Sequence, residues 1–397
     1  MLVQFKMKNV LSFKEETIFD MTAISAYKEH VSNLIDIDKK EKFLRVAAIY
    51  GANASGKSNF VCAMRFFQRI IVESLNNVDD GAEPILEKYS MPFSFEDKME
   101  NSEFEIVEII DNEEYQYGFE YNSESIVMEW LYRKNLDTNR KVTIFERATQ
   151  EVNLGASVRK ECEVYKDQIP SETLVLSFFN KLKLKTDIYK KVYTGIMDIL
   201  VLSSDACENT GVLNAILPQI IDNEKEELLE FLAAIDTGIK NISYDENEKE
   251  IIFYTFHKGA DGEMYPLNLY NESEGTIKSI MLFIYAKTAI YKDGMIVIDE
   301  LNVKLHPLLL KFIIDLFYNN DSKAQLIYTT HDTTLMDKKF FRRDQIWFVQ
   351  KDDLGHSELC ALSDFKVRSD ASFEKDYLSG VYGGIPFLKD FSLKAGE

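Results

Sequence analysis

Several kinds of chemistry are missing from this sequence of 397 residues. It has four cysteines, Cys62, Cys162, Cys207 and Cys360, and no CxxC pair, so neither a disulfide framework nor a zinc finger is expected. It also lacks HExxH, GxSxG and GxGxxG motifs, which leaves metalloprotease, hydrolase-elbow and dinucleotide-binding functions without support. We expect reduced, structural thiols in a cytoplasmic protein.

Long apolar stretches are missing as well. No window approaches the run of ~20 apolar residues that a membrane helix needs. The opening Met1-Leu2-Val3-Gln4-Phe5-Lys6-Met7-Lys8 alternates like a strand and does not resemble a secretory signal. No membrane contact is therefore expected, and the 46% apolar share is enough for a sizeable core.

Positive charge is scarce, because 66 Asp and Glu outnumber 46 Lys and Arg and give a net charge of −20. This balance argues against a globally basic nucleic-acid surface. Two short basic pieces, Lys181-Leu182-Lys183-Leu184-Lys185 and Phe341-Arg342-Arg343, leave a local groove open, although such runs are usually solvated. Nucleic acid is therefore a possible partner that the sequence does not indicate.

A phosphate-binding loop is present. The run Gly51-Ala52-Asn53-Ala54-Ser55-Gly56-Lys57-Ser58 fits GxxxxGK[ST] without exception. The apolar residues 46–50 before it predict a buried strand. A helix is expected from Lys57 to about Ser74, with one buried stripe of apolar side chains at Phe60, Met64, Phe67 and Ile71.

Each part of this loop has an expected role. The glycines let the backbone curl, so that the N–H groups of Gly51, Asn53, Ala54, Ser55 and Gly56 point at phosphate oxygens. The N-terminus of the helix adds partial positive charge. Lys57 is expected to reach the β- and γ-phosphates, and the Ser58 hydroxyl is expected to bind Mg²⁺.

A second buried strand ends in two carboxylates, in Gly294-Met295-Ile296-Val297-Ile298-Asp299-Glu300. Asp299 is expected to hold Mg²⁺ through its water shell, and Glu300 to polarise the attacking water as a general base. By itself this pattern also fits a strand followed by a solvated acidic turn. Paired with the loop at Gly51, it predicts a nucleoside triphosphatase, and the interval from Lys57 to Asp299 is longer than a small GTPase or simple kinase needs.

Two further segments contain residues that could contact a phosphate group. In Asn271-Glu272-Ser273-Glu274-Gly275-Thr276 a polar turn runs into an apolar helix, Ile277 to Ile290, and Ser and Gly at a helix start can bind an anion or simply cap the helix. In Gln325-Leu326-Ile327-Tyr328-Thr329-Thr330-His331-Asp332 a predicted core strand ends at a histidine. A lone histidine is more often structural than functional, but this one follows a strand end as the carboxylates do.

Together these residues resemble the SMC/ABC-like AAA-type ATPases of bacterial abortive-infection and anti-phage defence loci, the group that includes AbiLi and RloA. The resemblance extends to Asn9-Val10-Leu11-Ser12-Phe13, Tyr115–Tyr121, Gln345–Val349 and Tyr377–Pro386. It implies that Ser273 and Gly275 grip the γ-phosphate held by a partner subunit, and that His331 is the switch histidine. Asn302, in the loop Leu301–Pro307, stands where the family usually has an acidic residue, which weakens an inter-subunit role there. Gln68 and Gln116 are the candidates for the Q-loop glutamine.

The resemblance implies an α/β P-loop NTPase fold of the ABC/SMC-head type, with an antiparallel β lobe and an inserted helical lobe. We expect an N-terminal ATPase half at residues 1–155, which includes the hairpin Phe104–Tyr121. A helical insertion without a coiled-coil heptad run is expected at 156–240. The C-terminal half, 241–397, is expected to hold strands at 251–256, 295–298, 325–328 and 345–349.

The expected function is that of an ATP- and Mg²⁺-dependent ATPase that acts as a homodimer or higher oligomer. It would sense infection and regulate a separate effector, such as an RloB-like or TOPRIM nuclease, because fewer than the ~100 residues of such a domain follow His331. A RecF-like DNA repair or recombination ATPase is an alternative that the acidic charge disfavours. A non-hydrolysing, nucleotide-bound scaffold is another, against which the set Lys57, Ser58, Asp299, Glu300 and His331 argues.

Overall fold

The computed structural model describes residues 1–37, 41–75, 84–96, 100–204, 210–247, 250–368 and 371–386. One of its two large sheets is antiparallel and has seven strands in the order β10-β9-β8-β7-β6-β1-β2. These strands are β1 (Leu2–Lys8), β2 (Thr17–Asp20), β6 (Ser102–Ile110), β7 (Glu113–Tyr121), β8 (Ile126–Asn135), β9 (Lys141–Ala148) and β10 (Glu151–Leu154).

The other large sheet has six strands in the order β11-β15-β16-β5-β17-β18, all parallel except the last pair. Its strands are β5 (Val46–Tyr50), β11 (Ile199–Leu202), β15 (Met295–Ile298), β16 (Gln325–Thr330), β17 (Ile346–Lys351) and β18 (Ser357–Ala361). Two smaller sheets consist of β3 (Leu34–Asp36) with β4 (Lys42–Leu44), and of β12 (Ile239–Glu246), β13 (Ile251–Lys258) and β14 (Met264–Asn268).

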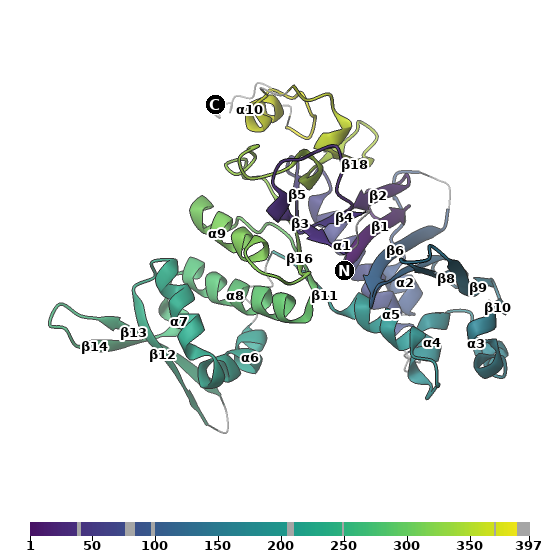
Figure 1. The fold of residues 1–397 in the computed structure, drawn as a ribbon, viewed down its shortest axis with the longest axis horizontal. Coiled ribbons are helices and arrows are strands. Elements are labelled where there is room, and N and C mark those ends of the chain that lie inside the picture. Colours follow the sequence, from purple (N-terminus) through teal and green to yellow (C-terminus); the bar gives the residue numbers. More distant parts are fainter. Residues whose placement is uncertain are drawn as a thin grey trace, which may run out of the picture.

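The helices fall into groups that cover these sheets. They are α1 (Lys57–Glu73), α2 (Ile85–Tyr89), α3 (Ala156–Cys162), α4 (Val175–Lys181), α5 (Ile188–Met197), α6 (Thr210–Asn223), α7 (Lys225–Ala234), α8 (Glu274–Lys292), α9 (Pro307–Tyr318) and α10 (Phe373–Leu378). In Figure 1, α3 to α5 lie beside the antiparallel sheet, whereas α6 to α8 lie on the opposite side of the molecule, from which β12 to β14 project. Within the described ranges, every helix is too short or too polar to cross a bilayer.

Helix α1 is buried between the two large sheets, and this position explains its sequence. The predicted stripe of Phe60, Met64, Phe67 and Ile71 is buried throughout. The Phe67 ring also stacks on Phe119 of the antiparallel sheet, with centroids 5.6 Å apart. Because α1 touches a sheet on each side, further apolar side chains at 61, 63, 66 and 70 are buried too.

The parallel sheet divides the interior into two cores. In β5, Ala47 and Ile49 pack into the core that α1 shares with the antiparallel sheet. Their neighbours Val46, Ala48 and Tyr50 pack into the core formed with α8 and α9. A strand buried on both faces needs a continuous apolar run, which is what residues 46–50 provide.

The predicted hairpin at Phe104–Tyr121 is confirmed as β6 and β7, which turn at Asp111 and Asn112 with positive φ angles of 50° and 63°. Strands predicted at 251–256, 295–298, 325–328 and 345–349 correspond to β13, β15, β16 and β17. The helices expected between 156 and 240 are present, but β11 interrupts them and pairs with β15. Its short apolar run Ile199–Leu202 has no alternation that would distinguish it from a helical segment, so this strand was not predicted.

Gln325, at the start of β16, ties the two large sheets together. Its side chain is fully buried, accepts from the Leu2 N–H at 2.7 Å, and donates to the carbonyls of Leu2 and Leu44, each at 3.0 Å. Leu2 belongs to the antiparallel sheet, whereas Gln325 belongs to the parallel one. One amide group therefore satisfies backbone groups that the junction of the sheets would otherwise leave without partners.

Replacing Gln325 by Leu is expected to lower the free energy of unfolding by about 3 kcal/mol, because three buried backbone groups lose their partners. Urea denaturation followed by circular dichroism measures the change. The matched control is Gln219→Leu on the exposed side of α6, which should shift stability by less than about 0.5 kcal/mol. Equal effects of the two substitutions would contradict the role of Gln325.

Candidate active site

The loop between β5 and α1 has the shape that phosphate binding requires. Gly56 has a φ of 120°, and a Cβ there would lie 2.3 Å from the Ser357 hydroxyl oxygen. A Cβ on Gly51 would lie 2.5 Å from the Val349 carbonyl oxygen. Both positions therefore need glycine, because a side chain would collide with β17 or β18 or with the loop itself.

Residues distant in sequence support this loop from behind. The Ser357 hydroxyl donates to the Ser55 carbonyl at 2.6 Å and lies 2.7 Å from the Ser12 hydroxyl. Asn59, on α1, donates to the same Ser12 oxygen at 2.7 Å. Ser12 lies in the segment Asn9–Phe13, which the sequence singled out without indicating a role for it.

Lys57, the first residue of α1, reaches back into the loop. Its ammonium donates to the carbonyls of Gly51 at 2.8 Å and Ala52 at 3.0 Å, and the residue is only 6% exposed. Burial lowers the pKa of Lys57, and the nearby negative charges of Glu300 and Asp299 oppose that shift. The structure thus brings the loop lysine and the predicted carboxylates together.

The carboxylates are positioned by the neighbouring strand. The Thr329 hydroxyl, in β16, donates to Asp299 Oδ1 at 2.6 Å and accepts from the Glu300 N–H at 2.8 Å. Asp299 is buried, and Glu300 has a positive φ of 51°. A left-handed conformation at a non-glycine residue is sparsely populated, and the bond to Thr329 helps to hold it.

The predicted switch histidine follows the same strand. The Asn302 amide lies 3.4 Å from His331 Nε2, in position to donate to it. Asn302 also accepts from the Thr330 hydroxyl at 2.8 Å. The residue that departs from the family pattern is therefore buried within this chain, where it orients His331. The sequence did not indicate this contact.

Ser273 and Gly275 lie at the start of α8, beside the loop that follows Glu300. The Ser273 hydroxyl accepts from the Thr276 N–H at 3.1 Å and so caps the helix. A Cβ on Gly275 would lie 2.9 Å from the Lys304 carbonyl oxygen, so only glycine allows this close packing. Lys278, one turn further, donates to the carbonyls of Leu301 at 3.0 Å and Val303 at 2.7 Å.

The predicted loop residues 51–58 and the carboxylates fit a triphosphate and a divalent cation. The buried Ser55 hydroxyl has no hydrogen-bond partner among the described residues and can donate to a phosphate oxygen. Ser58 and Asp299 offer the hydroxyl and carboxylate oxygens that Mg²⁺ prefers. No cluster of three or more His, Cys, Asp or Glu side chains suited to holding a metal by itself occurs in the described residues.

Several other candidates from the sequence have structural roles. Gln68 donates to the carbonyls of Ile196 at 2.7 Å and Ile199 at 2.8 Å, and Gln116 donates to Glu105 on the antiparallel sheet. Both amides are thus bonded to groups other than the phosphate loop, Asp299 and Glu300. Arg342, from the second basic piece, is 1% exposed and is bonded to Asp344, so it cannot contact nucleic acid. Cys62, Cys162 and Cys360 are free thiols, and Cys207 lies outside the described residues.

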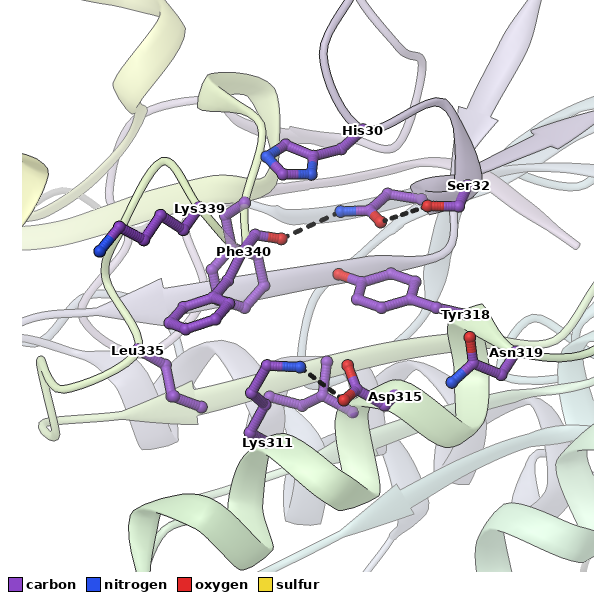
Figure 2. Close-up of a pocket in the computed structure, with 12 residues that line it drawn as sticks. His30, Ser32, Lys311, Asp315, Tyr318, Asn319, Leu335, Lys339 and Phe340 are labelled. Atoms are coloured by element: carbon purple, nitrogen blue, oxygen red, sulfur yellow. Dashed lines mark hydrogen bonds and ion pairs between the residues drawn. The ribbon is translucent and has the colours of Figure 1, made fainter.

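A polar cavity of about 290 Å³ lies away from these residues, between α9 and the loops 30–33 and 335–341 (Figure 2). Three of its polar side chains already have partners: Lys311 with Asp315 at 2.5 Å, His30 with the Lys338 carbonyl at 2.7 Å, and Asn33 with the Phe340 carbonyl at 3.1 Å. None of the predicted site residues lines it. The cavity therefore forms no part of the candidate active site.

The parallel sheet, its phosphate loop and its acidic strand end define a P-loop nucleoside triphosphatase fold. Residues 46–153 and 208–337 match a family described as "AAA domain, putative AbiEii toxin, Type IV TA system". The chain belongs to this family of AAA-type ATPase domains, and the matched ranges contain Lys57, Asp299, Glu300 and His331.

Solved structures with a similar fold include two SMC heads. The SMC head domain from Thermotoga maritima has 15% identity and a TM-score of 0.42, with 91% of this chain and 98% of that one covered. An SMC head bound to the C-terminal winged-helix domain of ScpA has 14% identity and a TM-score of 0.44, with 94% and 99% covered. No curated protein matches the chain. The function is therefore argued from the site itself.

Thr329→Val is expected to lower kcat for ATP hydrolysis about 10- to 100-fold, because Asp299 loses a donor and the Glu300 N–H loses its acceptor. ATP affinity should change little, since the phosphate loop is untouched. Steady-state phosphate release and calorimetric ATP binding measure the two effects. The isosteric control Thr288→Val, on α8, removes a hydroxyl that bonds only to its own helix and should leave turnover unchanged. A Thr329 variant with the parent kcat would contradict the assignment.

Proposed function

We propose that this chain hydrolyses ATP at the junction of the phosphate loop with the ends of β15 and β16. The observation that carries the proposal is the Thr329 hydroxyl, which bonds to both Asp299 and Glu300 on a strand that lies beside β5. The negative charges of both carboxylates act on Lys57 and raise its pKa, against the effect of burial. Binding and hydrolytic groups therefore meet at one edge of the sheet, where ligands of parallel α/β folds bind.

Each side chain has a role that its surroundings support. Lys57 neutralises charge on the β- and γ-phosphates, and the loop N–H groups orient the chain of phosphates. Glu300 accepts a proton from the water that attacks the γ-phosphorus. His331, held by Asn302, donates to the γ-phosphate. Mg²⁺ held by Ser58 and Asp299 would supply compensation of phosphate charge during the reaction.

The exposed start of α8 supports a second part of the proposal, that two copies of the chain share each site. Ser273 is exposed and stands at a helix N-terminus, where an anion is favourable. Lys278 and the Gly275–Lys304 contact fix this helix start to the loop that follows Glu300. A phosphate bound at Ser273 in one copy would thus affect the position of the loop that follows Glu300 in the same copy. A homodimer or higher oligomer is the assembly that this arrangement favours.

The biological role proposed is that of a cytoplasmic sensor and regulator of a separate effector, such as a nuclease, in bacterial anti-phage defence. The family description, which names a toxin and a toxin–antitoxin system, supports this role. The motifs that resemble those of AbiLi and RloA proteins also support this proposal. In such a role, ATP occupancy sets the assembly state, and the assembly state sets the activity of the effector.

Glu300→Gln is expected to lower ATP turnover by at least about 100-fold, because the amide cannot accept the proton of the attacking water. The amide should still allow ATP and Mg²⁺ to bind, and the ATP-bound form should accumulate as a dimer or larger assembly. Phosphate release and light scattering coupled to size exclusion measure both effects. Glu230→Gln, at an exposed carboxylate on α7, is the matched control. Parent-like turnover by the Glu300 variant would exclude it as the general base.

A mixture of two inactive variants tests the shared site. Lys57→Ala disables the phosphate loop, and Ser273→Arg disables the start of α8. If each site combines the loop of one subunit with the α8 start of another, random exchange should restore about a quarter of the wild-type turnover. Neither variant alone should be active. No recovery, in a mixture that forms mixed assemblies by native mass spectrometry, would show that both residues act within one subunit.

A further inference from the structure

A cavity of about 600 Å³ opens beside the phosphate loop and is not used by the phosphates or the carboxylates. Ser12 and Asn59 line it on the side of the loop, and Met91, Phe93 and Phe95 line it on the other. We propose that this cavity holds the base of the bound nucleoside triphosphate, with the Phe95 ring as its stacking surface. The inference rests on the proposed function, because it extends from the phosphates to the rest of the nucleotide.

The order of the strands determines on which side of the loop the nucleoside must lie. Asp299 follows β15 and His331 follows β16, and both strands lie on one side of β5. The γ-phosphate belongs on that side, with the groups that hydrolyse it. On the other side of β5 lies β17, which ends at Lys351 and turns through Gly355, and both of these residues line the cavity. A triphosphate whose γ end meets Glu300 thus directs its nucleoside end toward the cavity.

Asn59 marks the path between the two ends. It lies two residues beyond Lys57 on α1, past the residues expected to hold the β- and γ-phosphates. Its amide donates to the Ser12 hydroxyl at 2.7 Å, which fixes the side chain at the mouth of the cavity. The sugar would therefore pass over Asn59 and Ser12 before the base meets the aromatic wall.

The loop that carries the aromatic wall is held in place by the segment Asn9–Phe13 and its neighbour Lys14. Asn9 Oδ1 accepts from the Phe93 N–H at 3.0 Å, and the Leu11 N–H donates to the Met91 carbonyl at 2.7 Å. Lys14 pairs with Glu96 at 3.2 Å. A stacking surface needs such preorganisation, because ordering a mobile loop would subtract from the binding free energy.

The rings themselves have the geometry of a platform with one free surface. Phe93 is buried and lies against His356, with ring centroids 4.5 Å apart. Phe95 meets Phe93 edge to face, at 5.4 Å and 83°, and its own edge lies close to Gly355. Phe95 is nevertheless 72% exposed. A phenylalanine fixed by its neighbours but open to solvent at the end of the nucleotide path is suited to stack on a base.

Isothermal titration calorimetry with two ligands tests the proposal. Phe95→Ala should weaken binding of Mg²⁺–ATP about 5- to 150-fold, the range for loss of one base–aromatic stack. It should leave binding of Mg²⁺–tripolyphosphate, which has no base, unchanged. Phe95→Tyr should retain ATP affinity within about threefold, because the ring is kept. Tyr291→Ala, at a 90% exposed aromatic near the end of α8, is the control and should affect neither ligand.

The outcomes separate this inference from the function on which it rests. If the wild type binds both ligands and Phe95→Ala weakens neither, or weakens both equally, the base does not stack on Phe95 and the inference is wrong. If the wild type binds neither ligand, the phosphate loop itself has been misassigned and the proposed function fails with it. A loss confined to ATP, restored by Phe95→Tyr, establishes Phe95 as the stacking residue.

Discussion

The Thr329 hydroxyl bonds to both Asp299 and Glu300, two adjacent residues whose side chains have different proposed roles. In the proposed mechanism Asp299 must remain near the cation and Glu300 must turn toward the water, whereas a regular strand would direct their side chains to opposite faces. The left-handed backbone at Glu300 resolves this conflict, and the bond from its N–H to Thr329 stabilises it. In the proposed mechanism, hydrolysis therefore depends on β16 as much as on the strand that carries the carboxylates.

The same dependence extends along the edge of the parallel sheet. Thr330 is in register with Tyr50, so β16 and β5 end opposite each other, and β15 ends at Ile298, opposite Tyr328 and two residues before the end of β16. A shift of one residue in the pairing of β15 with β16 would move Thr329 away from Asp299 and turn its side chain to the other face. Gln325 holds the opposite end of β16 against the antiparallel sheet, which explains why a residue remote from the site is fully buried and bonded.

The sequence could predict features formed by consecutive residues, but not those that depend on contacts between residues far apart in the chain. The phosphate loop and the strand before Asp299 are continuous motifs, and their structures match the predictions closely, from Lys57–Glu73 for α1 to Met295–Ile298 for β15. Thr329 and Lys278 could not be identified, because a Thr or Lys near a strand or helix end is common. Their importance comes from partners that are far away in sequence. In the sequence, Asn302 was notable only because the resembling family usually has an acidic residue there. In the structure its amide lies next to His331 of the same chain.

The C-terminal segment illustrates the same limit. Its sequence Tyr377–Pro386 supported the family resemblance, but no residue in it has obvious chemistry. In the structure, Tyr377 stacks on Phe348 with centroids 5.3 Å apart and lies 6.3 Å from the ring of Tyr50, the residue before the phosphate loop. Glu374 accepts from the Thr333 hydroxyl at 3.0 Å, just beyond His331. The segment thus packs against the strand that leads into the phosphate loop, and the helix that begins just before the segment is bonded two residues beyond His331, so a movement of the loop would have to be accommodated by this aromatic contact.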